Sequence, residues 1–261
     1  MRNIDTAFIT GTGFYKLENM QEMELLPVST PYGDVAVQIA SLGNKTIAFI
    51  PRHGAKHALA PSQINFQANI FALHLLGVKR ILSTSVSGSI SRSFPPGTLV
   101  LVNQFINFST GRKDTFYPLD GKLMHVDMTD PYCATIHQQL LKVAKEMNID
   151  LKSGAVYGCF DGPRFETRAE IEMARRLGID LVGQTNYPEV ALARELAICY
   201  ATVGFASNFA AGMEGNLTVT EVMQAVKNSG DIISRLFSGW LQSYPQVEDC
   251  SCHHALDEAG I

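Results

Sequence analysis

The sequence carries little charge: only 18% of its 261 residues are charged, and the formal net charge is −4. A protein that neutralises nucleic-acid phosphates over a wide face needs an excess of Lys and Arg, which this chain lacks. It also lacks an apolar run of the roughly 18 residues that span a bilayer. Its first residues do not resemble the hydrophobic segment of a secretory signal. We therefore expect a cytoplasmic protein whose ligand, if anionic, is small.

Cysteine is also scarce, with five residues. Three of them lie in apolar contexts, where a small buried hydrophobe is the expected role: Cys133, Cys159 and Cys199. The tail places Cys250 and Cys252 beside His253 and His254, a combination of soft metal ligands. Four adjacent ligands cannot easily surround one ion, so we expect no metal site.

Short Val-, Ile- and Ala-rich runs are the main structural pattern. They do not alternate cleanly with polar residues, which is typical of strands buried on both faces. The predicted strands are 4–10, 34–42, 46–51, 80–86, 98–102, 154–160, 180–185 and 199–207.

Helix signals lie between several of these runs. They are Pro61 with Gly77 as start and end, Asp130-Pro131 as a start, the capping box Thr167–Glu170 before a helix ended by Gly178, and a second capping box Thr218–Glu221. Strands that alternate with helices predict one α/β domain over residues 1–245, followed by a tail over 246–261. We expect a mixed, largely parallel central sheet flanked by helices, with the ligand beyond the carboxyl ends of the strands.

Polar motifs follow several predicted strands. Thr12 lies between two glycines in a loop that suits an anion, although a plain turn explains the same residues. Arg52-His53 offers a guanidinium fork for phosphate, or simply solvated surface charge. Ser85 and Thr185 add hydroxyl groups, and Thr185 precedes a predicted helix N-terminus.

Two further positions in the sequence could contact a heterocyclic ring. Phe165 offers a face for stacking and Glu166 a carboxylate acceptor, although an acid at a helix start needs no ligand. Asn208 can both donate and accept a hydrogen bond, although asparagine is also common in turns.

Together these motifs are specific enough to indicate one protein family. They occur in one order and spacing over residues 4–245: Gly11-Thr12-Gly13, Arg52-His53-Gly54-x-x-His57, Pro61 with Asn65-Phe66-x-Ala68-Asn69, Ser87-Gly88-Ser89, Gly162-Pro163-Arg164-Phe165, Arg168-Ala169-Glu170 and Pro188-Glu189-Val190. The chain thus resembles the methylthioadenosine phosphorylase branch of the trimeric purine nucleoside phosphorylase family. The resemblance implies the nucleoside phosphorylase fold and cleavage of a purine nucleoside by phosphate.

The resemblance also implies roles for individual residues. Those expected to hold phosphate are Thr12, Arg52, His53, Ser85, the backbone N–H of Val86, and Thr185. The ribose should lie near Gln184, where the family normally has methionine. The residues expected around the base are Phe165, Glu166, Asn208, Phe209 and Ala210. Arg52, His53 and Asn208 would act in catalysis by positioning phosphate and by stabilising charge on the leaving base. Phosphate is then a co-substrate, and we expect no cofactor and no covalent nucleophile.

Departures from the family bear on the substrate. Methylthioadenosine enzymes carry aspartates at the positions of Asn208 and Ala210, whereas the pair Glu166 and Asn208 resembles that of 6-oxopurine phosphorylases. Val219 stands where inosine phosphorylases carry histidine for the 5′-hydroxyl.

The 5′ end of the sugar should therefore meet apolar side chains, which favours a methylthio group. Val222 and Met223 share the helical face of Val219, although such spacing also fits a plain core helix. Leu256 in the tail is a further candidate, and His125 resembles the residue that a neighbouring subunit contributes in family trimers. These features predict a homotrimer that cleaves S-methyl-5′-thioinosine. The alternatives are a methylthioadenosine phosphorylase, an inosine/guanosine phosphorylase, or a nucleoside- or phosphate-binding protein without catalysis.

Overall fold

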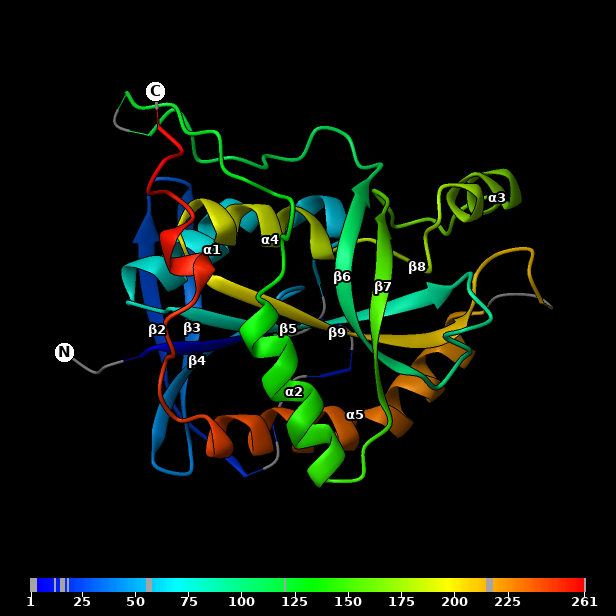
Figure 1. The fold of residues 1–261 in the computed structure, drawn as a ribbon, viewed down its shortest axis with the longest axis horizontal. Helices are drawn as coiled ribbons and strands as arrows, with labels where there is room; N and C mark the ends of the chain where they lie inside the picture. The colour runs from blue at the N-terminus through cyan, green and yellow to red at the C-terminus, as the bar shows by residue number, and fades with distance from the viewer. Residues whose placement is uncertain are drawn as a thin grey trace.

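The computed structural model describes residues 4–11, 13–14, 17, 19–54, 58–119, 121–214 and 218–260 (Figure 1). Among these residues, nine strands form one sheet: β1 Thr6–Thr10, β2 Met20–Thr30, β3 Gly33–Leu42, β4 Lys45–Pro51, β5 Arg80–Ser89, β6 Leu99–Asn107, β7 Leu151–Cys159, β8 Leu181–Gly183 and β9 Cys199–Phe209. The helices are η1 Pro61–Gln63, α1 Phe66–Leu75, α2 Ala134–Glu146, α3 Arg168–Arg176, α4 Asn186–Glu195, α5 Val219–Ser243 and η2 Ser251–His254.

The sheet is mixed, in the order β2-β3-β4-β1-β5-β8-β7-β6-β9. Pairing is parallel between β1 and both β4 and β5, between β5 and β9, and along β6, β7 and β8. It is antiparallel in the β2-β3-β4 meander and where β5 meets β8 and β6 meets β9. Because β9 pairs with both β5 and β6, five strands close into a ring. The mixed α/β sheet in one domain was predicted, but the closure of the ring was not.

Helices cover both faces of the sheet. In Figure 1, α1 and α4 lie on one side of β5 and β9, and α2 and α5 lie on the other. Strand β1 shows why the sequence lacks polar alternation. Ala7 and Ile9 pack into the core that contains α1 and α4, whereas Phe8 packs into the core that contains α2 and α5. Successive side chains point to opposite faces, and here both faces are buried.

The capping boxes form as predicted at α3 and in part at α5. The Thr167 hydroxyl accepts a hydrogen bond from the Glu170 N–H, and the Glu170 carboxylate accepts one from the Thr167 N–H. At α5, the Thr218 hydroxyl accepts a bond from the Glu221 N–H. The predicted start at Asp130-Pro131 is wrong, because the N-cap of α2 is Cys133. The Cys133 N–H donates to the Tyr200 carbonyl of β9, so this stretch pairs with the sheet before the helix begins.

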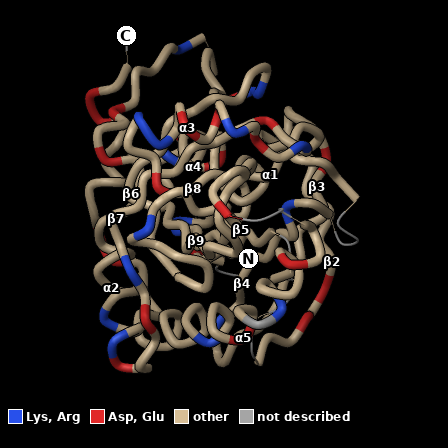
Figure 2. Tube along the Cα trace, turned by 90° about the vertical axis from the view of Figure 1, so that its right-hand side faces the viewer, with Lys and Arg blue, Asp and Glu red and all other residues tan. Residues whose placement is uncertain are grey.

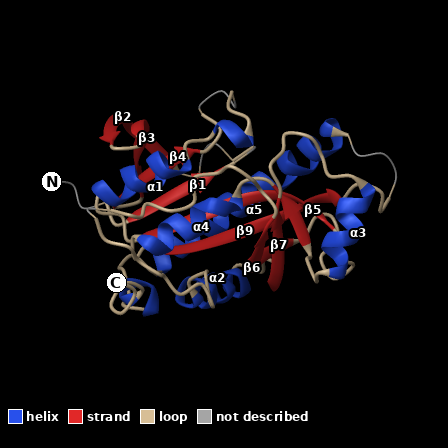
Figure 3. Ribbon diagram, turned by 90° about the horizontal axis from the view of Figure 1, so that it is seen from above, coloured by secondary structure: helices blue, strands red, loops and turns tan. Residues whose placement is uncertain are grey.

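Helix α3 stands apart from the other helices, at the end of the sheet where β5 terminates (Figure 3). A small third core joins its Ile171 and Ala174 to Phe160, Val182 and Ala210, which lie at the ends of β7, β8 and β9. Basic and acidic residues are interspersed along the trace in Figure 2. No helix in the described parts of the chain is long and apolar enough to cross a membrane.

Candidate active site

A cavity of about 340 Å³ opens at one end of the ring of strands. It lies where β4, β5, β8 and β9 end, as the sequence predicted for the ligand of such a sheet. The predicted site residues in its wall are Arg52, His53, Val86, Phe165, Glu166, Gln184, Thr185, Asn208, Ala210 and Val222. The structure therefore brings together residues that are up to 170 positions apart in the sequence.

Arg52 is buried immediately after β4. Its Nε and Nη2 donate to the two carboxylate oxygens of Glu189, both at 2.7 Å, and Nη1 donates to the Thr84 carbonyl at 2.9 Å. Burial alone would lower the pKa of Arg52, but the charge of Glu189 outweighs it and holds this pKa above its ordinary value. Three of the five N–H groups make these bonds, so at most two remain for an anion in the cavity.

Glu189 was not among the predicted site residues. It is fully buried on α4, and the Tyr200 hydroxyl donates to its Oε2 at 2.6 Å. The available signal was an acid within the apolar stretch 188–193, because a buried carboxylate requires a charged or hydrogen-bonding partner. That partner is Arg52, and the pair fixes the guanidinium beside the cavity.

His53 has a defined tautomer in its neutral form. Its Nδ1 lies 2.9 Å from the Leu59 carbonyl oxygen, which can only accept, so Nδ1 carries the proton. Nε2 of the neutral ring is then a hydrogen-bond acceptor.

The other predicted phosphate ligands differ in position. Val86 and Thr185 line the cavity, and Thr185 directly precedes α4, whose first turn is interrupted by the non-helical backbone of Tyr187. Ser85 lies behind the wall, with its Oγ 3.2 Å from both the Ser87 Oγ and the Tyr157 hydroxyl, and Ser87 lines the cavity instead.

Thr12 lies outside the described residues, although the preceding Gly11 lines the cavity. A Cβ on Gly11 would lie 3.0 Å from the Arg52 Nη1. Glycine therefore lets this loop approach the guanidinium.

Glu166 is buried in the wall of the cavity, and its Oε1 has no hydrogen-bond partner among the residues that the structure describes. Burial raises the pKa of this carboxyl above its ordinary value. Gln184 supports the loop that carries it, because the Gln184 Nε2 donates to the Arg164 carbonyl at 3.0 Å. The departure from the family methionine thus ties the end of β8 to the segment that bears Phe165 and Glu166.

Asn208 is held in one orientation at the end of β9. The Ser207 hydroxyl donates to its Oδ1 at 2.6 Å, and its Nδ2 donates to the Phe209 carbonyl at 2.8 Å. One proton on Nδ2 remains for a ligand. Ala210 lines the cavity beside it, whereas the Phe209 ring lies outside the wall, with the guanidinium of Arg92 stacked 4.7 Å from its centroid.

The predicted 5′ pocket is incomplete within one chain. Val222 lines the cavity, but Val219 and Met223 are 63% and 44% exposed and lie outside its described wall. His125 is exposed on the loop between β6 and α2, and Leu256 is half-buried in the tail, also outside that wall.

Comparisons with known proteins agree with this geometry. A family model described as the phosphorylase superfamily matches residues 5–241. A probable 6-oxopurine nucleoside phosphorylase of Dictyoglomus turgidum is 43% identical, over 97% of this chain and 96% of the relative. A probable S-methyl-5′-thioinosine phosphorylase of Methanopyrus kandleri is 42% identical, over 98% and 99%.

The fold is also that of a solved relative. Methylthioadenosine phosphorylase from Schistosoma mansoni in complex with adenine superposes with a TM-score of 0.90 at 26% identity, over 97% of this chain and 96% of that one. This confirms the nucleoside phosphorylase fold that the sequence motifs predicted. The chain belongs to the phosphorylase superfamily.

Proposed function

We propose that this protein cleaves the N-glycosidic bond of a 6-oxopurine nucleoside with phosphate, and that its substrate is S-methyl-5′-thioinosine. The observation that carries the proposal is the unpaired Oε1 of Glu166 in the cavity wall. A buried acceptor without a partner costs free energy that a ligand donor can recover. The N1–H of hypoxanthine or guanine supplies such a donor, whereas N1 of adenine has no hydrogen.

Asn208 and Ala210 support the same choice of base. The remaining proton on the Asn208 Nδ2 can bond N7 or O6 of an oxopurine. An exocyclic amino group would need an acceptor there, and the buried methyl of Ala210 offers none. The two named relatives described above both act, by their names, on oxopurine nucleosides.

The part of the cavity lined by Arg52, His53 and Thr185 suits phosphate. Arg52, His53 and Thr185 at the start of α4 line the same space, and the Arg52 guanidinium has at most two N–H groups left for an anion. Phosphorolysis proceeds as the bond between C1′ and the base nitrogen breaks and phosphate attacks C1′ from the opposite face. Electron density then grows on the base, where the Asn208 amide stabilises it at N7. Positioning and electrostatics are enough for this reaction, without a covalent intermediate.

The proposal also specifies a methylthio group at the 5′ end of the sugar. Val222 presents an apolar surface there, which favours a methylthio group over a hydroxyl. We propose that a homotrimer completes this pocket with His125 of a neighbouring subunit, since His125 is exposed and lies outside the cavity of its own chain. The cytoplasmic location expected from the sequence stays a prediction.

Purified protein should be tested on methylthioinosine, methylthioadenosine, inosine and guanosine, each with and without phosphate. We expect free base only with phosphate, and the highest kcat/KM on methylthioinosine. Binding without phosphate-dependent release of base would contradict catalysis. Cleavage of methylthioadenosine at least as well as methylthioinosine would contradict the choice of base, and preference for inosine would contradict the apolar 5′ pocket.

The double substitution Asn208→Asp with Ala210→Asp tests the same assignment from the protein side. It supplies acceptors for a 6-amino group and should shift the ratio of kcat/KM values toward methylthioadenosine by roughly 5- to 150-fold, the equivalent of about 1 to 3 kcal/mol for one mismatched buried polar group. Carboxylates close to Glu166 repel one another and raise its pKa further, so the ratio is the quantity to compare. An unchanged ratio would remove these residues from base selection.

A further inference from the structure

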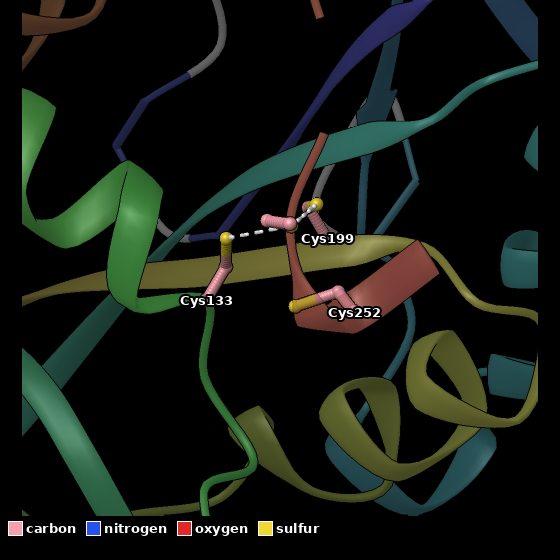
Figure 4. A group of neighbouring side chains, drawn as sticks. Cys133, Cys199 and Cys252 are labelled. Atoms are coloured by element: carbon pink, nitrogen blue, oxygen red, sulfur yellow. Dashed lines mark hydrogen bonds between the residues drawn. The ribbon is translucent and has the colours of Figure 1, made fainter. Parts of the chain in front are cut away.

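Four cysteines meet at the end of the molecule opposite the cavity. Cys133 precedes α2, Cys199 is the first residue of β9, and Cys250 and Cys252 come from the tail. Figure 4 shows Cys133, Cys199 and Cys252 pointing toward one another from these three segments. Asn208 lies nine residues along β9 from Cys199, so the cluster is about 30 Å from Asn208 in the cavity wall.

We propose that these four cysteines bind one zinc ion as a tetrathiolate site. The proposal does not depend on the function proposed above. The sequence predicted no metal site because the adjacent ligands of the tail cannot easily surround one ion. The folded chain adds ligands from two distant segments. Cys133 and Cys199, expected to be plain buried hydrophobes, supply the two ligands that a site built from the tail alone would lack.

The spacing of the sulfurs fits a shared ion. Zinc bound tetrahedrally at about 2.3 Å from each sulfur places the sulfurs about 3.8 Å apart. Here the Cys133 and Cys250 sulfurs are 3.8 Å apart, those of Cys199 and Cys250 are 3.2 Å apart, and all four lie within 4.8 Å of one another. Bonded disulfide sulfurs lie about 2.05 Å apart. Because the zinc ion imposes no preferred geometry of its own, it accommodates this spread.

The surroundings suit thiolates. Three of the four cysteines are buried, and the Arg194 Nη1 donates to the Cys252 sulfur at 3.4 Å. The His253 Nε2 lies 3.4 Å from the Cys199 sulfur. Such groups orient metal-bound sulfurs and offset the negative charge that four thiolates leave on a divalent ion.

The site would join the tail to the body of the protein. Arg80 already holds the start of the tail through the carbonyls of Tyr244 and Gln246. Beyond the cysteines, the Ala259 carbonyl accepts a bond from the His125 N–H. Zinc would fix the segment between these two contacts, so its role is structural.

Metal content is the first test. The full-length chain is produced in medium containing zinc and purified under a phosphine reductant, and zinc is measured by mass spectrometry. We expect about one zinc ion per chain in the wild type. The double variant Cys250→Ser with Cys252→Ser should lose it, whereas Cys159→Ser, which alters a buried cysteine outside the cluster, should keep it. A reduced wild type without zinc, or a double variant that retains it, would overturn the proposal.

Cobalt is the second test, and it reports the ligands directly. Reduced wild type and Cys159→Ser loaded with Co²⁺ should show sulfur-to-cobalt charge-transfer absorption and the intense visible bands of tetrahedral cobalt, and the double variant should show neither. Removal of the metal by a chelator should lower the Tm of the wild type but not of the double variant. Cobalt binding without the thiolate bands, or four thiols that remain paired as disulfides under reductant, would contradict the proposal.

Discussion

Arg52 and Glu189 form an ion pair in which neither side chain has meaningful contact with solvent. Removing one charge from such a pair leaves the other buried and uncompensated, which costs about 3 to 5 kcal/mol. The pair therefore determines where the guanidinium lies and also contributes to whether the chain folds.

We expect Glu189→Gln to lower the free energy of unfolding by about that amount, because the amide cannot neutralise Arg52. Phosphorolysis should fall with it, since the guanidinium loses its fixed orientation. Denaturant unfolding and kcat/KM for phosphate are the measurements. The control is Glu172→Gln in the exposed pairs with Arg175 and Arg176, which should change neither. Wild-type stability in Glu189→Gln would disprove the structural role of the pair.

Glu166 should give the pH profile an acid limb. The ionised carboxylate accepts the N1–H, and burial raises the pKa of Glu166 above its ordinary value. The value of kcat/KM should therefore begin to fall at a higher pH than an exposed glutamate would produce. In Glu166→Gln this limb should disappear and kcat/KM at neutral pH should drop roughly 5- to 150-fold. An unchanged acid limb would assign it to another group.

The same carboxyl affects stability in the opposite sense. A folded-state pKa above the unfolded value means that the folded protein binds the proton more tightly. Glu166 thus contributes stability below its unfolded pKa, and that contribution is lost as the pH rises through the folded pKa. Glu166→Gln should consequently have a Tm at neutral pH equal to or above that of the wild type while losing activity.

At the scale of elements, helix α3 positions the loop that carries Phe165 and Glu166. Its capping box at Thr167 directly follows Glu166, and the Glu170 carboxylate that completes the box also binds the Arg164 guanidinium on the other side of that loop. The start of the helix therefore fixes the segment that carries Phe165 and Glu166.

Thr167→Ala should cost about 1 kcal/mol of stability and raise the KM for the nucleoside, because the start of α3 loses the bond from the Glu170 N–H to the Thr167 hydroxyl and holds the adjoining loop less firmly. Asn65→Ala is the matched control. It removes the N-cap of α1, where the Asn65 side chain accepts from the Ala68 N–H, but no residue of α1 lines the cavity. It should reduce stability similarly without changing the KM. Equal KM effects in both variants would contradict a specific role for the α3 cap.

The strands buried on both faces were predictable, and β2 was not. Continuous apolar runs such as β1 and β9 meet helices on each side, so their composition reveals them. Strand β2 is an edge strand with a bulge between Glu22 and Glu24 and a proline at position 27. Most of its side chains are exposed, the apolar Met23 and Leu25 among them, so burial does not determine its composition. Its stability comes from pairing with β3, which no local pattern records.

At the scale of the whole molecule, the single chain supplies the residues that we propose for phosphate and base, whereas Val219 and Met223, expected at the 5′ end, lie outside the described wall of the cavity. A trimer in which His125 enters a neighbouring site predicts that His125→Ala reduces activity although His125 lies outside its own cavity. The measurements are the mass of the assembly in solution and kcat/KM with methylthioinosine.

Mixing two defective subunits tests the sharing of residues. Asn208→Ala and His125→Ala chains, each weakly active, should recover activity when co-expressed, because some sites then combine an intact Asn208 with an intact neighbouring His125. Asn208→Ala mixed with Glu166→Gln is the control, since both residues belong to the same chain's cavity. No recovery should occur there, because every cavity in that mixture carries one of the two changes. No recovery in the first mixture would contradict a shared site.

Those residues of the candidate site that belong to local sequence motifs could be predicted. Arg52 and Thr185 follow strands, Asn208 lies at the end of β9 and Glu166 lies in the loop between β7 and α3. All four were predicted as site residues, and all four line the cavity. The Glu189 partnership and the cysteine cluster depend on contacts between segments more than a hundred positions apart. Neither has a local pattern, because each residue type is unremarkable until the fold brings its partner close.

The Arg52–Glu189 pair also bears on how the cavity selects among anions. With the guanidinium charge already matched, the site exerts little long-range attraction and distinguishes an anion by the number and direction of the hydrogen bonds it can form. Chloride, which is spherical and has no separate oxygen atoms to accept hydrogen bonds in fixed directions, should compete poorly with a tetrahedral oxyanion. Because the buried pair is only weakly screened by dissolved ions, phosphate binding should vary little with ionic strength. An enzyme built in this way keeps its co-substrate affinity across the salt concentrations that a cell encounters.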